Sequence, residues 1–309
     1  MQDALSGIGV IWLVIGVGWL IARLGLVDQS GRRMMIGLAF SVGSPALLFS
    51  LVSRAELGSL FSVTLGVTVL AVLATMVVYL VVSQVWFRPS LGDRVIGLMS
   101  SAYTNAANFG LPIALALLHD ATWVAPVLLV QVGVIMPACL ALLDTSRARA
   151  TGTRLSLWRY GVMPLKNPIT VGILAGLVVS LTGLAIPTPL TAAIEMVGGM
   201  AVPLMLLSFG VSLRLDPVPG PGAHTAHLWL TVGLKVVLHP FAAWALANAF
   251  GLDGPDRYAV VVLAALPTAQ NVYVIASNYR QSELSARDAV FWSTILSMGV
   301  LIIIAALLG

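Results

Sequence analysis

Long apolar runs recur along the whole chain and constrain its fold more than any other feature. Each run reaches about 18 residues or more, enough for one helix to cross a hydrocarbon core of about 30 Å. Because lipid offers no hydrogen bonds to the backbone, a spanning segment must be a helix or part of a closed barrel. The runs are too long and too continuously apolar for the alternating strands of about 10 residues found in barrels. We therefore expect an all-α polytopic membrane protein.

The composition also indicates a lipid-embedded chain. Its 309 residues are 59% hydrophobic and 9% charged, whereas an average soluble domain has about 25% charged residues. The basic residues are not interleaved with aromatic residues on one helix face, as they are in many nucleic-acid-binding helices. We therefore expect a lipid bilayer and no nucleic acid as a partner. The one cysteine, Cys139, excludes an internal disulfide and argues against a cysteine metal cluster.

Ten spans are predicted when the apolar runs are cut at charged residues, glycine and proline. They comprise residues 5–23, 34–53, 61–87, 95–118, 123–143, 168–184, 190–213, 228–250, 258–279 and 289–308. Cytoplasmic loops accumulate Lys and Arg. Of the 16 such residues, 13 lie in alternate loops, and only Arg54 and Arg257 lie in the opposite loops. We therefore expect a multi-pass protein of the bacterial inner membrane with both termini on the periplasmic or extracellular side.

Two sets of residues recur at fixed spacings. Gly18, Gly25 and Pro45 recur 158 residues later as Gly176, Gly183 and Pro203, and Asp93, Arg94 and Asn108 recur 163 residues later as Asp256, Arg257 and Asn271. Each half holds five predicted spans, an odd number, so the second copy is inverted relative to the first, as in many secondary transporters. We expect a first repeat at residues 1–143, a basic cytoplasmic linker at 144–166 and a second repeat at 167–309.

The fourth and ninth predicted spans carry polar residues beside a proline. The sequence from Ser100 to Pro112 is the most polar stretch inside any span, and its counterpart runs from Leu266 to Tyr273. Pro112 and Pro267 each remove a backbone donor and clash with the preceding turn. We therefore expect both helices to be broken in mid-membrane, where half-helix N-termini carry partial positive charge.

Amide side chains lie beside both predicted breaks. They are Asn105, Asn108, Gln270 and Asn271. Each amide supplies donors and an acceptor, so together they could bind a carboxylate. The alternative is that they satisfy the backbone groups freed by the prolines or join neighbouring helices. Their clustering at two related breaks favours a substrate site.

These stretches, together with Ser44-Pro45-Ala46-Leu47-Leu48-Phe49, resemble the auxin efflux carrier family over essentially the whole chain. That family includes bacterial malonate and malate carriers and the plant auxin carriers. The resemblance implies a ten-helix fold related to the bile acid sodium symporters, with crossed, broken helices four and nine around the substrate. It also implies a small organic anion as substrate, such as malonate, malate or an indole acid, and its plant members suggest a homodimer.

Several residues match the family motifs directly. Asn105 matches the asparagine of the first crossover, Gly110-Leu111-Pro112 matches a Gly-Ile-Pro, and Pro267 matches the second crossover proline. Thr104 stands where the plant carriers have a proline, which leaves the position of the first break open. Next to these motifs, an apolar substrate body could pack on Phe109 and Tyr273.

Three further polar residues inside spans are candidates. Glu195 is either a proton or cation site or an acid at the start of a helix. Lys235, which shares a helix face with His239, could attract the anion, pair with Glu195 or extend along the helix toward the interface. Gln131 could line the site or join helices. Coupling to protons or to sodium is open at this point, and no other cofactor is indicated.

An enzyme or receptor is the rival class. Intramembrane hydrolysis needs a nucleophile with a base or an acidic pair, and metal enzymes need clustered ligands. The sequence offers neither pattern, and it has no Gly-Lys-Ser/Thr phosphate loop for pumping driven by ATP. A secondary active transporter is therefore the predicted function, and a sodium-coupled organic anion symporter of the bile acid type is the alternative.

Overall fold

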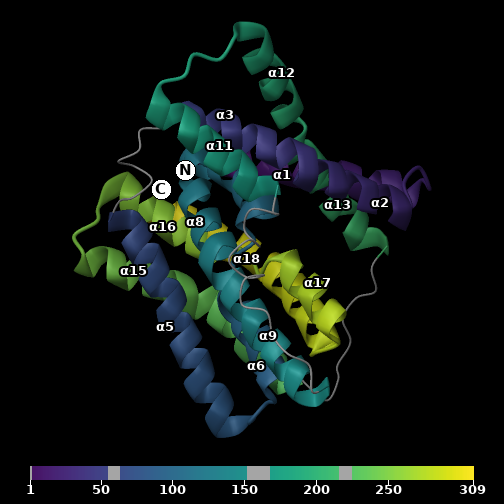
Figure 1. Cartoon of the computed structure of the whole chain (residues 1–309), viewed down its shortest axis with the longest axis vertical. Coiled ribbons are helices and arrows are strands. Elements are labelled where there is room, and N and C mark those ends of the chain that lie inside the picture. Colours follow the sequence, from purple (N-terminus) through teal and green to yellow (C-terminus); the bar gives the residue numbers. More distant parts are fainter. Residues whose placement is uncertain (1, 55–62, 152–167, 216–224) are drawn as a thin grey trace. The chain divides into compact units, whose positions relative to one another are not determined.

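A computed structural model describes residues 2–54, 63–151, 168–215 and 225–309 (Figure 1). Within these ranges the secondary structure is helical, and no β-strand occurs apart from one isolated bridge between Thr104 and Thr268. The all-helical prediction is therefore confirmed for the described chain.

Six helical segments are long and apolar enough to cross a membrane. They are Gln29–Arg54, Val63–Trp86, Ala121–Arg147, Thr188–Leu215, Thr225–Ala249 and Glu283–Leu308. Shorter apolar helices cover Trp12–Arg23, Ala106–Leu118 and Pro168–Thr182. The chain is therefore a multi-pass membrane protein, as predicted.

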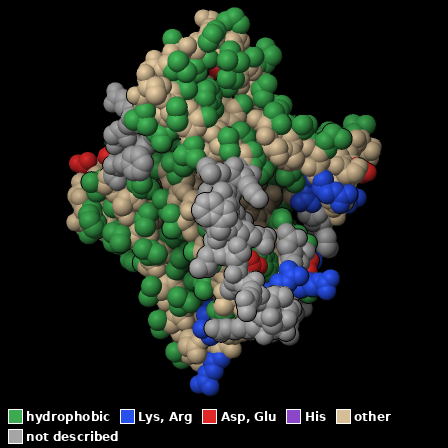
Figure 2. Space-filling model, in the orientation of Figure 1, with side chains coloured by type: hydrophobic (Ala, Val, Ile, Leu, Met, Phe, Trp, Pro, Cys, Tyr) green, Lys and Arg blue, Asp and Glu red, His purple; other side chains and the backbone are tan. Residues whose placement is uncertain are grey.

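Exposed apolar side chains cover much of the helix surface in the view of Figure 2, where Lys and Arg gather in only a few places. In α5 (Val63–Trp86), for example, Val77, Val81 and Val85 are all exposed. In water such a surface would be an aggregation hazard, whereas in a bilayer it contacts lipid tails.

The chain forms two compact units, and each unit combines segments from both halves of the sequence. The first unit comprises residues 1–61, 107–129 and 164–218, and the second comprises residues 62–106, 130–163 and 219–309. These units are defined by contacts and not by similarity, so the predicted repeats at 1–143 and 167–309 stay a prediction. The predicted linker begins inside helix α9 (Met136–Thr151), and its residues 152–166 lie outside the described residues.

Close packing of helices through glycine characterises the first unit. Its helices are α1 (Gln2–Arg23), α2 (Gln29–Leu38), α3 (Ser44–Arg54), α7 (Leu111–Ile113), α8 (Val124–Val130), α11 (Pro168–Thr182), α12 (Thr188–Gly199) and α13 (Ala201–Leu215), with shorter turns η1 (Ala39–Gly43), η2 (Ala106–Gly110), η3 (Ala114–Leu118) and η4 (Ala121–Trp123). A Cβ atom added to Gly18 of α1 would lie 2.3 Å from the carbonyl oxygen of Leu207 in α13. The corresponding distance from Gly176 of α11 to the carbonyl of Phe49 in α3 is 2.8 Å. Small residues thus let these backbones touch, as is common in membranes.

The second unit holds the longest helices and the two helices that precede the predicted breaks. Its elements are α5, α6 (Leu91–Ala102), η5 (Gln131–Ile135), α9, α14 (Thr225–Gly233), η7 (Leu234–Leu238), α15 (His239–Ala249), α16 (Gly254–Ala265), α17 (Gln270–Tyr279) and α18 (Glu283–Leu308). One core cluster joins α6, α9 and α17 through buried apolar residues such as Ile96, Leu143 and Val272. The helices that flank the predicted breaks, α6 and α17, are therefore packed into one apolar core.

Widened π-helical turns precede four of the prolines. The turns η1, η2, η5 and η7 end two residues before Pro45, Pro112, Pro137 and Pro240, respectively. A proline ring clashes with the carbonyl four residues earlier, so the preceding turn must open to accept it. Prolines inside these helices therefore widen the helix without ending it.

Candidate functional site

The first helix break lies at Thr104. Helix α6 ends at Ala102, and Tyr103 is extended, with φ −82° and ψ 108°. Pro112, where we expected the break, instead follows the widened turn η2, so that prediction is corrected. The physical reason is that a proline inside a helix can be accepted by opening the preceding turn.

The second break lies at Pro267, as predicted. Helix α16 ends at Ala265, and Leu266 has φ −59° and ψ 147°. A residue before proline is disfavoured in the helical region because it clashes with the proline Cδ atom. The chain resumes helical structure at Gln270, the first residue of α17.

The two breaks lie antiparallel and hydrogen bond to each other. The amide of Asn105 donates to the carbonyl of Pro267 at 2.8 Å, and the amide of Ala269 donates to the carbonyl of Tyr103 at 3.0 Å. Two backbone donors near the broken helix ends therefore have partners inside the protein, which a lipid environment requires. The crossing of the two breaks is thus a fixed structural element of the second unit.

Buried hydroxyl groups complete the crossing. Thr268 is fully buried; its amide donates to Oγ of Ser293 at 3.0 Å, and its hydroxyl donates to the carbonyl of Ser100 at 2.6 Å. Ser100 lies in the last turn of α6, where carbonyl groups lack partners within the helix. Sequence reasoning did not identify Thr268 or Ser293, although each adds a small polar group to an apolar span.

Lys235 lies at the centre of this cluster and is 0% exposed. Its Nζ atom donates to Oγ1 of Thr104 at 2.9 Å and to the carbonyl of Ala264 at 3.1 Å, and it lies 2.7 Å from Nδ1 of His239. The side chain therefore joins both broken helices and does not extend toward the interface. His239 was noted from its spacing to Lys235, but its direct contact with the lysine was not predicted.

The candidate amides of the second unit differ in their surroundings. Asn105 is buried, whereas Gln270, Asn271 and Tyr273 are half-buried in the first turn of α17. Gln131 is 2% exposed, and both polar atoms of its amide are buried with no hydrogen-bond partner in the described chain. A buried amide without a partner is costly, so Gln131 is a strong candidate for contact with water or a ligand.

The remaining candidates belong to the first unit. Asn108 is half-buried, Gly110 and Pro112 are buried, and the ring of Phe109 packs edge-on against Phe209 at 5.3 Å between centroids. The packing of Phe109 on Phe209 shows that this aromatic residue has a structural partner.

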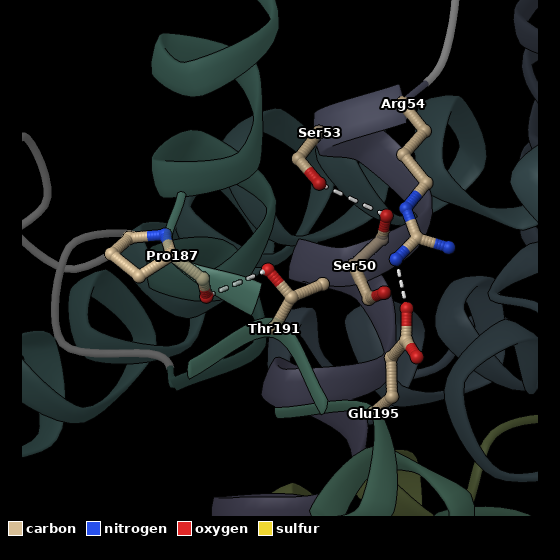
Figure 3. A network of polar contacts seen from close by, with 6 residues as sticks. All are labelled: Ser50, Ser53, Arg54, Pro187, Thr191 and Glu195. Atoms are coloured by element: carbon tan, nitrogen blue, oxygen red, sulfur yellow. Dashed lines mark hydrogen bonds and ion pairs between the residues drawn. The ribbon is translucent and has the colours of Figure 1, made fainter. Parts of the chain in front are cut away.

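Glu195 forms an ion pair with Arg54 within the first unit (Figure 3). Both side chains are exposed, and Arg54 lies at the end of α3, where a neighbouring serine, Ser53, donates to the carbonyl of Ser50. The predicted alternatives for Glu195 included a pair with Lys235, but the described contacts of Lys235 are all with other groups. An exposed ion pair is held weakly, which leaves Glu195 able to exchange partners.

Residues 8–152 and 153–305 match a family model described as "Membrane transport protein". The chain belongs to this family. The match covers nearly all of the sequence, so the chain is a membrane transporter and not an enzyme.

Three curated relatives agree with the family match. A "Putative malonate transporter" of Rhizobium meliloti (strain 1021) is 28% identical over 92% of this chain and 89% of its own length. An "Uncharacterized transporter" of Methanothermobacter thermautotrophicus is 23% identical over 94% of this chain and 93% of its own length. A "Probable auxin efflux carrier component 5c" of Oryza sativa subsp. japonica is 26% identical over 51% of this chain and 45% of its own length. The resemblance to the auxin efflux carrier family is therefore confirmed.

Proposed function

We propose that this membrane transport protein is a secondary active carrier that moves a small organic carboxylate across the inner membrane by alternating access. The pair of hydrogen-bonded breaks at Thr104 and Pro267 is the observation that carries this proposal. It places the N-terminus of α17, with the half-buried amides of Gln270 and Asn271, next to Asn105. Backbone N–H groups at a helix start and side-chain amides are suitable donors for a carboxylate.

The proposed architecture is ten spans in two inverted repeats. In its support, the contact of Gly18 with the Leu207 carbonyl recurs as that of Gly176 with the Phe49 carbonyl, and both members are shifted by 158 residues. Helices α6 and α16 both have 12 residues and start 163 residues apart. At their starts, Arg94 donates to Gln84 and Arg257 donates to Asn248. Duplication would produce similar contacts at matching or nearly matching positions, so these contacts support the proposed architecture.

A carboxylate is the proposed substrate class, and the relatives named for malonate and auxin support it. No acidic residue occurs between Ser100 and Pro112 or between Leu266 and Tyr273, which disfavours a cation. Gln131, whose buried amide atoms lack partners in the described chain, is proposed as a further contact. Asn108, Gly110, Pro112 and Tyr273 stay predicted members of the site.

Coupling to a proton or sodium ion is proposed at Lys235 or Glu195. The contacts favour Lys235, because it is fully buried and bonded to Thr104 at the crossing, whereas the Glu195 side chain is exposed. The 13 Lys and Arg residues in alternate loops support an orientation with both termini outside. A homodimer is proposed from the resemblance alone.

Purified protein in sealed liposomes provides the test. We expect saturable uptake of radiolabelled malonate, malate or an aryl acetate, with recovery of the compound unchanged and competition among carboxylates for one site. Uptake should be measured with and without sodium, since sodium dependence would favour a symporter of the bile acid type. Tight binding of an organic cation, with no competing carboxylate, would contradict the proposal.

A further inference from the structure

Two nitrogen bases, Lys235 and His239, lie in direct contact inside the second unit. Their Nζ and Nδ1 atoms are 2.7 Å apart, and the two side chains are 0% and 1% exposed. They stand one turn apart, where the widened turn η7 meets α15. A contact of this length between two nitrogens requires a proton between them, so the pair behaves as one unit for proton binding.

The contacts of the pair fit two protonation states. With an ammonium at Lys235, its three N–H groups match three acceptors: Thr104 Oγ1, the Ala264 carbonyl and Nδ1 of neutral His239. With one proton fewer, the amine keeps two N–H groups for Thr104 and Ala264 and accepts a hydrogen bond from Nδ1–H of His239. The heavy atoms need not move between these states, although the net charge differs by one.

The second ring nitrogen of His239 provides a route for the proton. Nε2 is buried and has no hydrogen-bond partner in the described part of the chain. In the neutral pair, where Nδ1 carries the hydrogen, Nε2 is a free acceptor. A proton that binds at Nε2 allows the Nδ1 proton to pass to Nζ, which leaves an ammonium and a neutral imidazole with its hydrogen on Nε2. The number of protons balances, and one positive charge is gained.

The described surroundings contain no carboxylate that pairs with this charge. The other titratable or charged residues on the elements packed against η7 and α15, and at the first break, are Tyr79, Asp93, Arg94, Tyr103, His227, Asp256, Arg257, Tyr258, Glu283, Arg287 and Asp288. Lys235 and His239 form no described hydrogen bond or ion pair with any of them. Several have partners of their own, as Asp93 has Ser282, Arg94 has Gln84 and Asp288 has Arg287.

We propose that Lys235 and His239 form the proton-binding site of this carrier and that one proton binds there with each carboxylate. The inference rests on the proposed function and adds the coupling ion to it. A charge inside a span is costly unless it is compensated. The protonated pair and a carboxylate beside Asn105, the residue after Thr104, compensate each other, so each favours binding of the other. Empty and loaded carriers thereby avoid an isolated buried charge.

Proton-driven accumulation in liposomes tests the pairing of proton and anion. Malonate is used between roughly pH 7 and 8, where its carboxyl groups are ionised, and potassium with valinomycin clamps the membrane potential at zero. If one proton accompanies each anion, a gradient of one pH unit drives a concentration ratio of about tenfold. A pH-sensitive dye inside the liposomes should record one proton entering per labelled anion. Accumulation that ignores the pH gradient, or follows sodium instead, overturns the proposal.

Matched histidine variants locate the site. His239→Asn keeps an acceptor for Lys235 but removes the second ring nitrogen, so we expect exchange of external for internal malonate to persist while the gradient-driven ratio falls to about one. The control is His119→Asn, since His119 is exposed, lies outside the crossing and has a positive φ that asparagine accepts. Unchanged gradient-driven accumulation in His239→Asn overturns the assignment.

If His239→Asn does not fold, the proton count of the natural protein still decides whether a proton accompanies the anion. Absence of carboxylate uptake by the natural protein in any gradient would instead refute the proposed function.

Discussion

The Nζ atom of Lys235 lies 2.9 Å from Oγ1 of Thr104, although 131 residues separate them in the sequence. The same Nζ donates to the carbonyl of Ala264 near the end of α16, so a single side chain joins both broken helices. In an apolar environment each of these hydrogen bonds replaces an unsatisfied polar group. The lysine therefore stabilises the crossing.

Removing the threonine hydroxyl tests this structural role. Thr104→Val has a similar shape but leaves a buried N–H of Lys235 without an acceptor, which costs about 1–3 kcal/mol. We expect a lower Tm in detergent for Thr104→Val and a Tm near that of the natural protein for Thr104→Ser. Equal Tm values for the valine and serine variants would show that the hydrogen bond contributes little.

Sequence alone predicted those features that a single local physical rule determines. Apolar length predicted helices in lipid, and Pro267 predicted the second break because proline restricts the residue before it. The first break at Thr104 was not located, because threonine has no such local constraint. Its position depends on contacts with Lys235 and Pro267, which lie far away in the sequence.

The prolines show where a local rule has two outcomes. Pro112 was expected to break its helix, but the preceding turn η2 widens to accept it. Lys235 lies in η7, a widened turn of the same kind, which ends two residues before Pro240. Widened turns are frequent at functional sites, so the proline five residues after Lys235 adds a second signal to the intramembrane charge that already made this lysine a candidate.

The amides of the proposed substrate site should contribute directly to binding. If the proposed site is right, Asn105→Ala, Asn108→Ala and Asn271→Ala each remove a hydrogen bond to a charged carboxylate, and we expect a loss of about 1.5–3 kcal/mol, or roughly ten-fold to over a hundred-fold in affinity. Uptake and binding of labelled carboxylate in liposomes and detergent provide the measurements. Asn248→Ala is the control, because Asn248 is exposed and bonds to Arg257. Full activity in all three variants would contradict the proposed substrate site.

Glycine contacts in the first unit support an independent prediction. A Cβ atom at Gly18 would overlap the backbone of α13, so we expect Gly18→Ala to lower the Tm and the yield of folded protein. Gly16→Ala lies in the same helix with nothing within 4 Å of the added atom. It should be neutral or slightly stabilising, because alanine favours the helix. Similar losses in both variants would mean that helix propensity, and not close packing, explains the effect.

The orientation prediction rests on the distribution of basic residues and can be tested by labelling single cysteines. Ser30 and Thr188 are both exposed near helix starts in the first unit, in α2 and α12. Ser30 belongs to the predicted connection 24–33, which contains Arg32 and Arg33, and Thr188 belongs to the predicted connection 185–189, which contains no Lys or Arg. We place one cysteine at either position in a Cys139→Ser background, which removes the one native thiol. Because basic loops stay in the cytoplasm, an impermeant maleimide added to intact cells should label Thr188→Cys and leave Ser30→Cys unlabelled until the membrane is opened.

Labelling of both variants after permeabilisation shows that each thiol can react. If Ser30→Cys reacts from outside and Thr188→Cys does not, the termini lie in the cytoplasm and the orientation proposed above is wrong.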